Sequence, residues 1–367
     1  MVKGSAVKLF QHTQQPFEIF ICNSWVHWSI VRKDGWVALT EYAFFNNIMP
    51  NQQRVMGLRM HPFLFLPLFF LPFLLIGDER TYPMKSGISI ENLRGHVQNL
   101  QFDRNPYDHF HELEKAGQYI YHEFSKVGLR VWEESFQWEG RKYNNIVAEK
   151  RGLGSPDKIF ILGAHYDTVP GSPGADDNAS AVAVLLEVAR NIQKVNLDST
   201  LRLIAFSLEE YGFIGSTYYA EKARREGEKM MGMISLEMVG FTHSRQNYPF
   251  YINPKYYPNV GDFIGIIGNE RSKALLEKVY QSFRAYIPQL PTEFLLVPGN
   301  GDGMEEVRLS DHSSFWDQGF AALMVTDTAF LRNPNYHLPS DAMETLDFEF
   351  MRKVAIGIFY SIVELAK

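Results

Sequence analysis

Short apolar segments rich in β-formers alternate with longer amphipathic segments through the C-terminal half of this chain. Segments of the first kind are typical of buried strands, and segments of the second kind are typical of helices. We expect strands at 158–162, 200–208, 232–238, 293–297 and 321–326. We expect helices at 105–127, 179–195, 215–225, 273–286, 311–318 and 348–366. This alternation predicts an α/β fold, a three-layer sandwich in which a mostly parallel central sheet has helices on both faces.

Two further strands, at 129–138 and 142–149, surround Glu139 and Gly140 and are expected to form a hairpin. In a mostly parallel sheet, ligands bind outside the carboxyl ends of the strands. Polar residues that follow an expected strand are therefore the first candidates for a functional site.

His165 and Asp167 come directly after the strand expected at 158–162. Residues two apart in an extended segment point to the same side, so the imidazole and the carboxylate are neighbours. A neutral histidine can bind a metal through one ring nitrogen and donate its other N–H to a carboxylate, which fixes the tautomer. This pair indicates a metal ligand with its orienting partner.

Asp176 and Asp177 follow in a Gly-, Pro- and Ser-rich turn that opens the helix at 179–195. Aspartates at a helix N-terminus are ordinary caps, and capping is one interpretation of this pair. The pair comes shortly after the histidine and aspartate of the preceding strand end, which favours a metal site instead.

The next expected strand is followed by Glu209 and Glu210, and Glu237 lies near the end of the strand at 232–238. Two adjacent carboxylates diverge, so one could bind a metal while the other moves a proton; a solvated loop is the alternative. An acid inside an apolar strand is costly unless it is paired or bound to a cation.

His337 lies in a Pro-rich loop after the strand at 321–326, where a surface histidine is the alternative interpretation. Asp311 belongs to another polar cluster, at the start of the short helix expected at 311–318. We expect Asp311 to contribute to a substrate pocket.

Five of these strand-end residues are candidate metal ligands. If they converge, their side chains supply two neutral imidazole nitrogens and three carboxylates. Two divalent cations would bring about +4 against about −3, and a bridging hydroxide would neutralise the site. Such a set suits two zinc ions that share one carboxylate, and Asp177, held by its turn, is the expected bridge. The expected ligands are His165, Asp177, Glu210, Glu237 and His337.

Composition limits the alternatives. The net charge is −6, which does not suggest a nucleic-acid partner. The chain has 1 cysteine, Cys22, so it can form neither an intrachain disulfide nor a cysteine-based zinc site. Any metal must be held by His, Asp and Glu.

The N-terminal part has a different character. Residues 1–55 are rich in Phe and Trp without a sustained period, and we interpret them as an irregular extension that precedes the true translation start at Met56 or Met60. Residues 56–77 contain the apolar run 62–76, which has the length of a signal-peptide core. An uncleaved membrane anchor is the alternative, because no small-x-small cleavage motif follows. Both readings predict an exported protein that is secreted, periplasmic or attached to a membrane.

Six local strings occur in the order in which a known family carries them: G-A-H-Y-D-T, G-A-D-D-N-A-S, E-E-Y-G-F-I-G-S, I-S-L-E-M-V-G, S-D-H-S-S-F-W and N-P-N-Y-H-L-P-S-D. The chain thereby resembles family twenty-eight of the metallopeptidases, the dizinc aminopeptidase family. That family includes bacterial leucyl aminopeptidases, glutamate carboxypeptidase II and the glutaminyl cyclases. The resemblance covers roughly residues 88–367, which we expect to be a zinc aminopeptidase catalytic domain.

The resemblance implies a role for each ligand. One zinc ion would take Asp177, Glu210 and His337, and the other would share Asp177 and add His165 and Glu237. The family usually has Asp where this chain has Glu237, and the extra methylene lengthens the reach to the second ion.

The resemblance also implies hydrolysis of the N-terminal bond of peptides with a free N-terminus. Glu209 would be the general base and Asp167 the orienter of His165. The aromatic segment 241–263 follows the Glu237 strand, so Tyr251 and Tyr256 are expected in the substrate pocket, with packing on the domain body as the alternative.

Three other functions stay open at this point. The first is a glutaminyl-peptide cyclase with a single zinc ion, and the second is a carboxypeptidase. The third is a non-catalytic binding module on the same fold. The adjacent pairs Asp176–Asp177 and Glu209–Glu210 favour the hydrolytic members over the cyclase.

Overall fold

The computed structural model describes residues 86–367 and four short strands in the chain before them. Strand β1 (Phe20–Cys22) pairs with β2 (Trp25–His27), and β3 (Val31–Arg32) pairs with β4 (Gly35–Trp36), both antiparallel. The rest of the expected extension at 1–55 and the apolar segment 56–77 lie outside the described residues. The chain divides into two units, Met1–Glu79 and Arg80–Lys367, and the site lies in the second.

The second unit is built on an 8-stranded sheet with the order β11-β10-β12-β9-β7-β8-β6-β5. Its strands are β5 (Arg130–Trp138), β6 (Arg141–Lys150), β7 (Ser155–His165), β8 (Ser199–Phe206), β9 (Lys229–Glu237), β10 (Ile264–Asn269), β11 (Thr292–Val297) and β12 (Ala322–Thr326). The pairs β7–β8, β7–β9, β9–β12 and β10–β11 are parallel. The pairs β5–β6, β6–β8 and β10–β12 are antiparallel. The expected mostly parallel sheet is confirmed.

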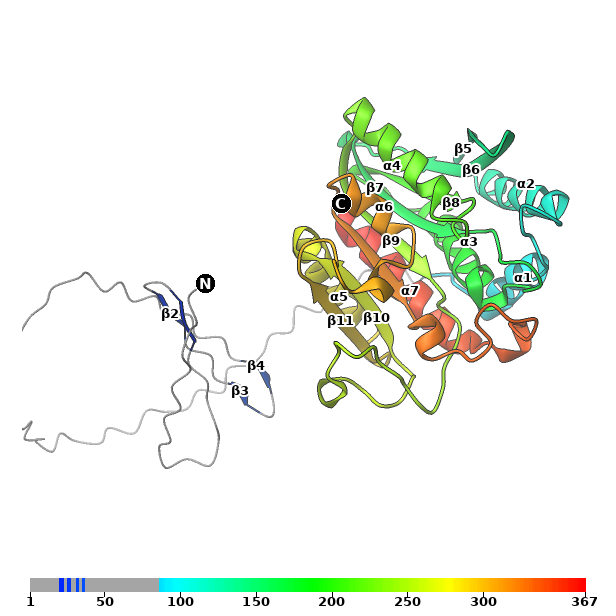
Figure 1. The fold of residues 1–367 in the computed structure, drawn as a ribbon. Coiled ribbons are helices and arrows are strands. Elements are labelled where there is room, and N and C mark those ends of the chain that lie inside the picture. Colours follow the sequence, from blue (N-terminus) through cyan, green and yellow to red (C-terminus); the bar gives the residue numbers. More distant parts are fainter. Residues whose placement is uncertain (1–19, 23–24, 28–30, 33–34, 37–85) are drawn as a thin grey trace, which may run out of the picture. The chain divides into compact units, whose positions relative to one another are not determined.

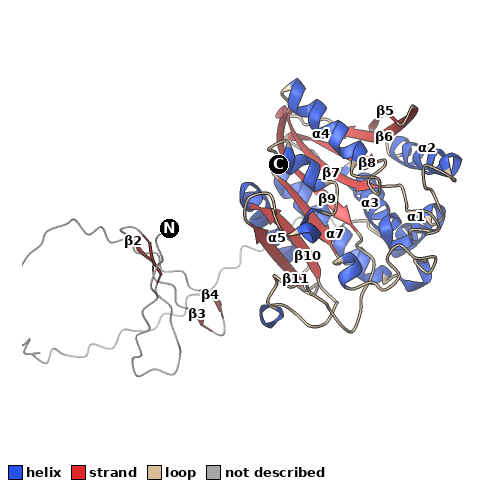
Figure 2. Cartoon of the chain, viewed as in Figure 1, coloured by secondary structure: helices blue, strands red, loops and turns tan. Residues whose placement is uncertain are grey.

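Helices cover both faces of this sheet (Figures 1 and 2). They are α1 (Ile90–Leu100), α2 (Phe110–Lys126), α3 (Ala181–Ile192), α4 (Ile214–Glu226), α5 (Lys273–Tyr286), α6 (His312–Asp317) and α7 (Phe348–Ala366). Single turns occur at Ala175–Ser180, Pro254–Tyr256, Glu270–Ser272, Glu305–Arg308, Ala329–Leu331 and Met343–Thr345. The three-layer α/β architecture follows the sequence-based expectation.

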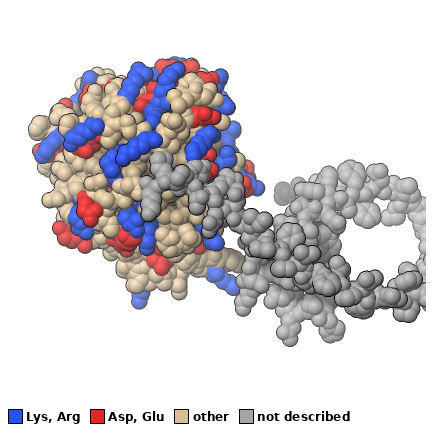
Figure 3. All heavy atoms as spheres, turned by 180° about the vertical axis from the view of Figure 1, so that it is seen from behind, with Lys and Arg blue, Asp and Glu red and all other residues tan. Residues whose placement is uncertain are grey.

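Alternating residues of the central strands enter two separate cores. On β7, Leu162 and Ala164 pack into the core that contains α3, α5 and α7, whereas Ile159 and Ile161 pack into the core that contains α4 and α6. This follows from the period of two in a strand, and it explains why the central strands are apolar on both faces. Acidic and basic side chains both occur across the face shown in Figure 3, with uncharged surface between them.

Most element boundaries lie within about three residues of those expected, and the larger differences are three. Helix α2 begins at Phe110 instead of 105, because the side chain of Asn105 accepts hydrogen bonds from the next backbone N–H groups and holds a turn there. Helix α1 and strand β10 were not predicted; Gly265 and Gly268 lower the strand propensity of β10. Within the described residues, no helix is both long enough and apolar enough to cross a membrane.

Candidate metal centre

Three adjacent parallel strands bring the candidate ligands to one edge of the sheet. β7 lies between β8 and β9 and is parallel to both. His165 is the last residue of β7 and Glu237 is the last residue of β9. Glu209 and Glu210 follow the end of β8 at Phe206. The carboxyl ends of parallel strands meet at one edge, so side chains distant in sequence become neighbours.

The carboxylate of Asp177 lies between the two imidazoles. Its Oδ1 is 3.2 Å from Nε2 of His165, and its Oδ2 is 3.1 Å from Nε2 of His337. Nε2 of His337 also lies 3.2 Å from a carboxylate oxygen of Glu210, and Nε2 of His165 lies 3.6 Å from one of Glu237. The structure thus gathers all five expected ligands around one shared carboxylate.

Asp167 holds the turn that carries the two adjacent glutamates. Its carboxylate is fully buried and accepts hydrogen bonds from the backbone N–H groups of Glu209, at 3.0 Å, and Glu210, at 3.1 Å. It also lies 3.6 Å from Nδ1 of His165, a separation slightly longer than a hydrogen bond. Its hydrogen-bond partners are therefore the two backbone amides, and the imidazole that the sequence indicated lies just beyond hydrogen-bond distance.

The turn that carries Asp177 is fixed from two directions. The carboxylate of Asp341 accepts hydrogen bonds from the backbone N–H groups of Asp176, at 2.9 Å, and Asp177, at 3.1 Å. The side chain of Asn178, which follows a cis peptide bond, bonds to the backbone on either side of Glu237. These contacts fix the shared carboxylate relative to the end of β9.

Left-handed backbone conformations occur beside the candidate ligands. Leu208, directly before Glu209, has φ 62°, Met238, directly after Glu237, has φ 45°, and His337 has φ 60°. This region is unfavourable for residues with a Cβ and is found preferentially at functional sites. The backbone therefore turns sharply at three of the positions that deliver a side chain to the centre.

Buried carboxylates dominate the electrostatics of the centre. Burial raises the pKa of Glu210 to about 8, and it raises the pKa of Glu209 and Glu237 as well. Burial opposes protonation of His337, but the carboxylates of Asp177 and Glu210 raise its pKa to about 10. The centre therefore favours positive charge, either as protons or as cations.

The donor set fits zinc. Nε2 of His165, Nε2 of His337 and Oε1 of Glu210 are buried without a hydrogen-bond partner. Nδ1 of His165 also has none, but it faces Asp167 and not the other ligands. Buried polar atoms are normally satisfied, so unpartnered atoms that converge indicate a bound ion. Zinc accepts imidazole nitrogen and carboxylate oxygen, and catalytic zinc sites combine these donors with an open position.

Two groups of ligand atoms within the described residues lie close enough to share an ion. His165, Asp177 and Glu210 form one group and His165, Glu209 and Glu237 form the other, with the ligand atoms of each group within 4.8 Å of one another. Glu209 is thus near enough to act as a ligand or, if it stays free, as a base.

The three residues expected in the substrate pocket lie in different places. Tyr251 lines an apolar cavity that begins at Glu237, and its hydroxyl donates a 2.7 Å hydrogen bond to Glu306. Tyr256, on the single turn Pro254–Tyr256, is 75% exposed and outside the residues that line the cavity. Asp311 is fully buried beside α6, also outside that lining, and neither of its carboxylate oxygens has a hydrogen-bond partner.

Three residues without a predicted role support the centre. Asp341 holds the Asp177 turn, and the hydroxyl of Ser310 donates a 2.9 Å hydrogen bond to Glu237. Asp327 follows β12 and accepts a hydrogen bond from the backbone N–H of Phe241. β12 is parallel to β9, so Asp327 follows a strand that ends at the same edge of the sheet as Glu237. The expectation that functional residues follow strand ends would therefore have found Asp327. Ser310 belongs to the polar cluster that contains Asp311 and to the string S-D-H-S-S-F-W, but neither pattern indicates a contact with Glu237.

A family model described as peptidase family M28 matches residues 145–362. Similar proteins include Escherichia coli YfbL, described as uncharacterized, which is 32% identical over 81% of this chain and 95% of the relative. A probable leucine aminopeptidase of Trichophyton verrucosum is 27% identical over 75% of this chain and 72% of the relative. Aminopeptidase YwaD of Bacillus subtilis is 28% identical over 61% of this chain and 45% of the relative.

Solved structures share the fold at low sequence identity. LapB from Legionella pneumophila is 23% identical with a TM-score of 0.62, over 76% of this chain and 73% of that one. BSAP, a zinc aminopeptidase from Bacillus subtilis, is 16% identical with a TM-score of 0.62, over 77% of this chain and 97% of that one. A glutaminyl cyclase from Bacteroides thetaiotaomicron is 18% identical with a TM-score of 0.57, over 75% of this chain and 98% of that one.

Proposed function

This chain belongs to peptidase family M28, and from that premise we propose that it is a zinc-dependent aminopeptidase that hydrolyses the N-terminal bond of peptides at a dizinc centre. The observation that carries the proposal is the position of Asp177. One of its carboxylate oxygens faces His165 and the other faces His337, as a carboxylate shared by two cations requires.

The distances support a division of the ligands between two ions. His337, Glu210 and one oxygen of Asp177 would hold the first ion. His165, Glu237 and the other oxygen of Asp177 would hold the second. When bound, zinc supplies Lewis-acid polarisation of the scissile carbonyl and lowers the pKa of water to about 7.

Glu209 is the proposed general base. Burial, together with repulsion from Glu237 and Glu210, raises its pKa above that of an ordinary glutamate, which suits a group that accepts a proton and then donates it. Asp167 fixes the backbone of Glu209 and Glu210, so the base and the adjacent ligand keep their relative positions. Glu209 takes the proton of the attacking water and passes it to the leaving amine.

Hydrolysis of aminoacyl-p-nitroanilides tests the proposal. The second unit of the protein is expected to release p-nitroaniline, to lose this activity with a chelator and to recover it when zinc is restored. Release that is insensitive to the chelator would contradict a metal-dependent reaction. N-terminally acetylated substrates are the control, because a free amine is required of an aminopeptidase substrate and not of an endopeptidase substrate.

The shared fold of glutaminyl cyclases makes cyclisation of N-terminal glutamine the second candidate. A Gln-peptide assayed by mass spectrometry separates the two reactions, because cyclisation releases ammonia whereas hydrolysis releases free glutamine. Formation of pyroglutamate without hydrolysis of other aminoacyl substrates would favour the cyclase.

We also propose that the apolar segment 62–76 directs export or anchors the enzyme to a membrane. The support is its length and composition alone. Cell fractionation, combined with N-terminal sequencing of the native protein, distinguishes a cleaved signal from an anchor. Recovery of the full chain from the cytosol would refute both.

A further inference from the structure

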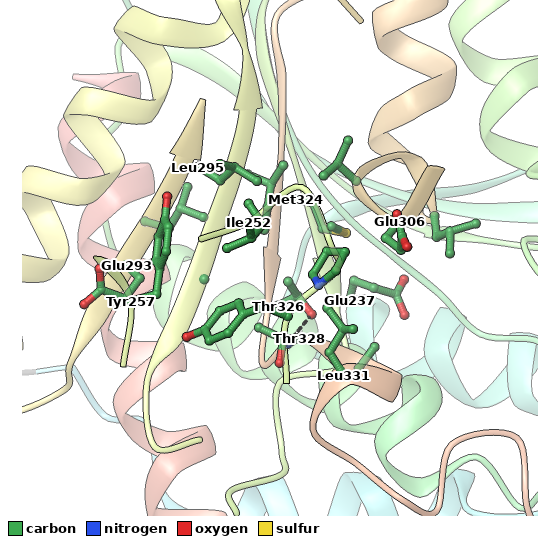
Figure 4. Close-up of a pocket in the computed structure, with 18 of the residues that line it drawn as sticks. Glu237, Ile252, Tyr257, Glu293, Leu295, Glu306, Met324, Thr326, Thr328 and Leu331 are labelled. Atoms are coloured by element: carbon green, nitrogen blue, oxygen red, sulfur yellow. Dashed lines mark hydrogen bonds between the residues drawn. The ribbon is translucent and has the colours of Figure 1, made fainter. Parts of the chain in front are cut away.

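The cavity that begins at Glu237 extends across the sheet to the edge strand β11. It contains about 850 Å³ of space, including its open mouth, and its walls are largely aromatic and aliphatic. Figure 4 shows Glu237 at one end, Glu293 and Tyr257 at the other, and Thr326 between them. The cavity is therefore a channel that leads away from the metal centre.

One row of residues in register forms the floor of this channel. Glu237 on β9 pairs with Thr326 on β12, Thr326 pairs with Gly265 on β10, and Gly265 pairs with Glu293 on β11. Directly paired residues point to the same face of a sheet. Three strand spacings separate Glu237 from Glu293, or roughly 14 Å between their backbones. A long side chain entering at the metal centre would run along this row toward Glu293.

Gly265 keeps the middle of the row open. A Cβ at this position would lie 3.4 Å from the backbone oxygen of Thr326 and 3.6 Å from Cδ1 of Ile267, which are ordinary contacts. The glycine is therefore not required by the backbone or by close packing. The absence of a side chain at Gly265 leaves space on the channel floor between Glu237 and Glu293.

The charged residues that line the channel are all acidic. Three of its lining residues are acidic and, of the lining residues described, none is basic. Glu237 belongs to the metal centre, and Glu306 accepts a hydrogen bond from the hydroxyl of Tyr251. Glu293 is partly buried and forms no ion pair or hydrogen bond within residues 86–367. Burial raises the pKa of Glu293, and the positive charge of Arg284 only partly opposes this effect.

On the basis of the aminopeptidase activity proposed above, we propose that this channel selects peptides whose first residue is arginine or lysine. The methylene stem of that residue would lie on the apolar walls, and its cationic end would meet Glu293. Both side chains combine an apolar stem with a charged tip, which matches an apolar channel that ends in a carboxylate. Glu293 acts on specificity and takes no part in the reaction.

Isosteric substrates test this inference. We would compare kcat/KM of the zinc-loaded protein for arginyl, citrullyl, lysyl, norleucyl, leucyl and alanyl p-nitroanilides. Arginine is expected to exceed citrulline about tenfold or more, because a hydrogen bond between charged groups is lost in the neutral analogue. Glu293→Gln should remove this difference while leucine stays within about twofold of its original value.

Two variants complete the design. Glu277→Gln removes the same charge from the exposed surface of α5, outside the channel, and should change none of the ratios. Gly265→Val fills the middle of the floor and should lower activity on arginine and lysine far more than activity on alanine. Thermal unfolding gives a readout independent of turnover: free arginine should raise Tm more than citrulline does, and Glu293→Gln should abolish this difference.

The outcomes separate the two proposals. Equal activity on arginine and citrulline, or equal losses on arginine and leucine in Glu293→Gln, would overturn the inference and leave the aminopeptidase proposal intact. If the zinc-loaded protein hydrolyses none of the six substrates, the proposed function fails. In that case an arginine-specific Tm shift that depends on Glu293 still supports a cation-binding channel, and its absence refutes it.

Discussion

The Nε2 atom of His337 lies 3.1 Å from one carboxylate oxygen of Asp177, although the two residues come from distant parts of the chain. The other oxygen of the same carboxylate faces His165 at 3.2 Å. One side chain thus joins two halves of the centre, so the loss of Asp177 and the loss of a ligand on one side should have different effects on metal content.

Asp177→Asn should therefore lower zinc binding at both positions, whereas Glu237→Gln should leave about one equivalent bound. In the proposed dizinc centre, removing the shared ligand would weaken the binding of both ions, whereas Glu237 would serve only the ion near His165. Metal content by mass spectrometry after dialysis measures this, with Glu277→Gln on the exposed surface of α5 as the control substitution. Retention of both equivalents in Asp177→Asn would refute the shared-ligand assignment.

Glu209→Gln should retain zinc and lose turnover by about 10²–10⁴-fold, because the amide cannot accept the proton of the attacking water. Steady-state kinetics and metal analysis on the same preparation test this. Glu210→Gln is the matched variant, since it changes the adjacent residue in the same way but should lose metal. Near-normal turnover in zinc-loaded Glu209→Gln would exclude Glu209 as the base.

The metal-free protein should become less stable as pH rises. Burial raises the pKa of Glu210 from 4.5 to about 8, so the folded state binds more protons than the unfolded state between these values and its free energy of unfolding falls with pH. His337, whose pKa is raised from 6.5 to about 10 by Asp177 and Glu210 against the effect of burial, acts with the same sign over its own range.

Denaturant unfolding with a chelator, at about pH 6 and about pH 9, measures this slope. Zinc should reduce the slope, because a bound cation takes the place of those protons. Glu210→Gln should also reduce it. A metal-free protein whose stability increases over this range would contradict the sign derived from the two groups.

Arg104→Met should lower the free energy of unfolding by about 3 kcal/mol or more, because it leaves buried carbonyl groups without donors. Arg104 is 1% exposed, and its guanidinium donates to the backbone oxygens of Tyr166 at 2.6 Å, Pro173 at 2.8 Å and Gly174 at 3.0 Å. These bonds hold the loop before Asp177. Urea unfolding compared with Arg271→Met, an exposed control, tests this; equal stabilities would refute it.

Local patterns predicted most of this architecture. Helices α5 and α7 were predicted at 273–286 and 348–366, the bounds that the structure shows, because a sustained apolar period reports the buried face of a helix. Strand β10 escaped prediction because its glycines weaken that signal. The start of α2 was misplaced because the side chain of Asn105 holds a local turn, which periodicity does not report.

The sequence by itself indicated candidate ligands in His165, Glu210 and Glu237 and a candidate base in Glu209, since each of these residues follows or ends a strand that is recognisable from its apolar residues. The sequence also predicted Asp177 as the bridging residue, but only the tertiary structure decided that its two oxygens face His165 and His337, and that Asp167 and Asp341 hold the turns that carry these groups. The reason is physical. A strand's direction and burial are encoded by neighbouring residues, whereas separations of a few ångströms across the sheet edge depend on strand order, register and loop paths set by the whole fold.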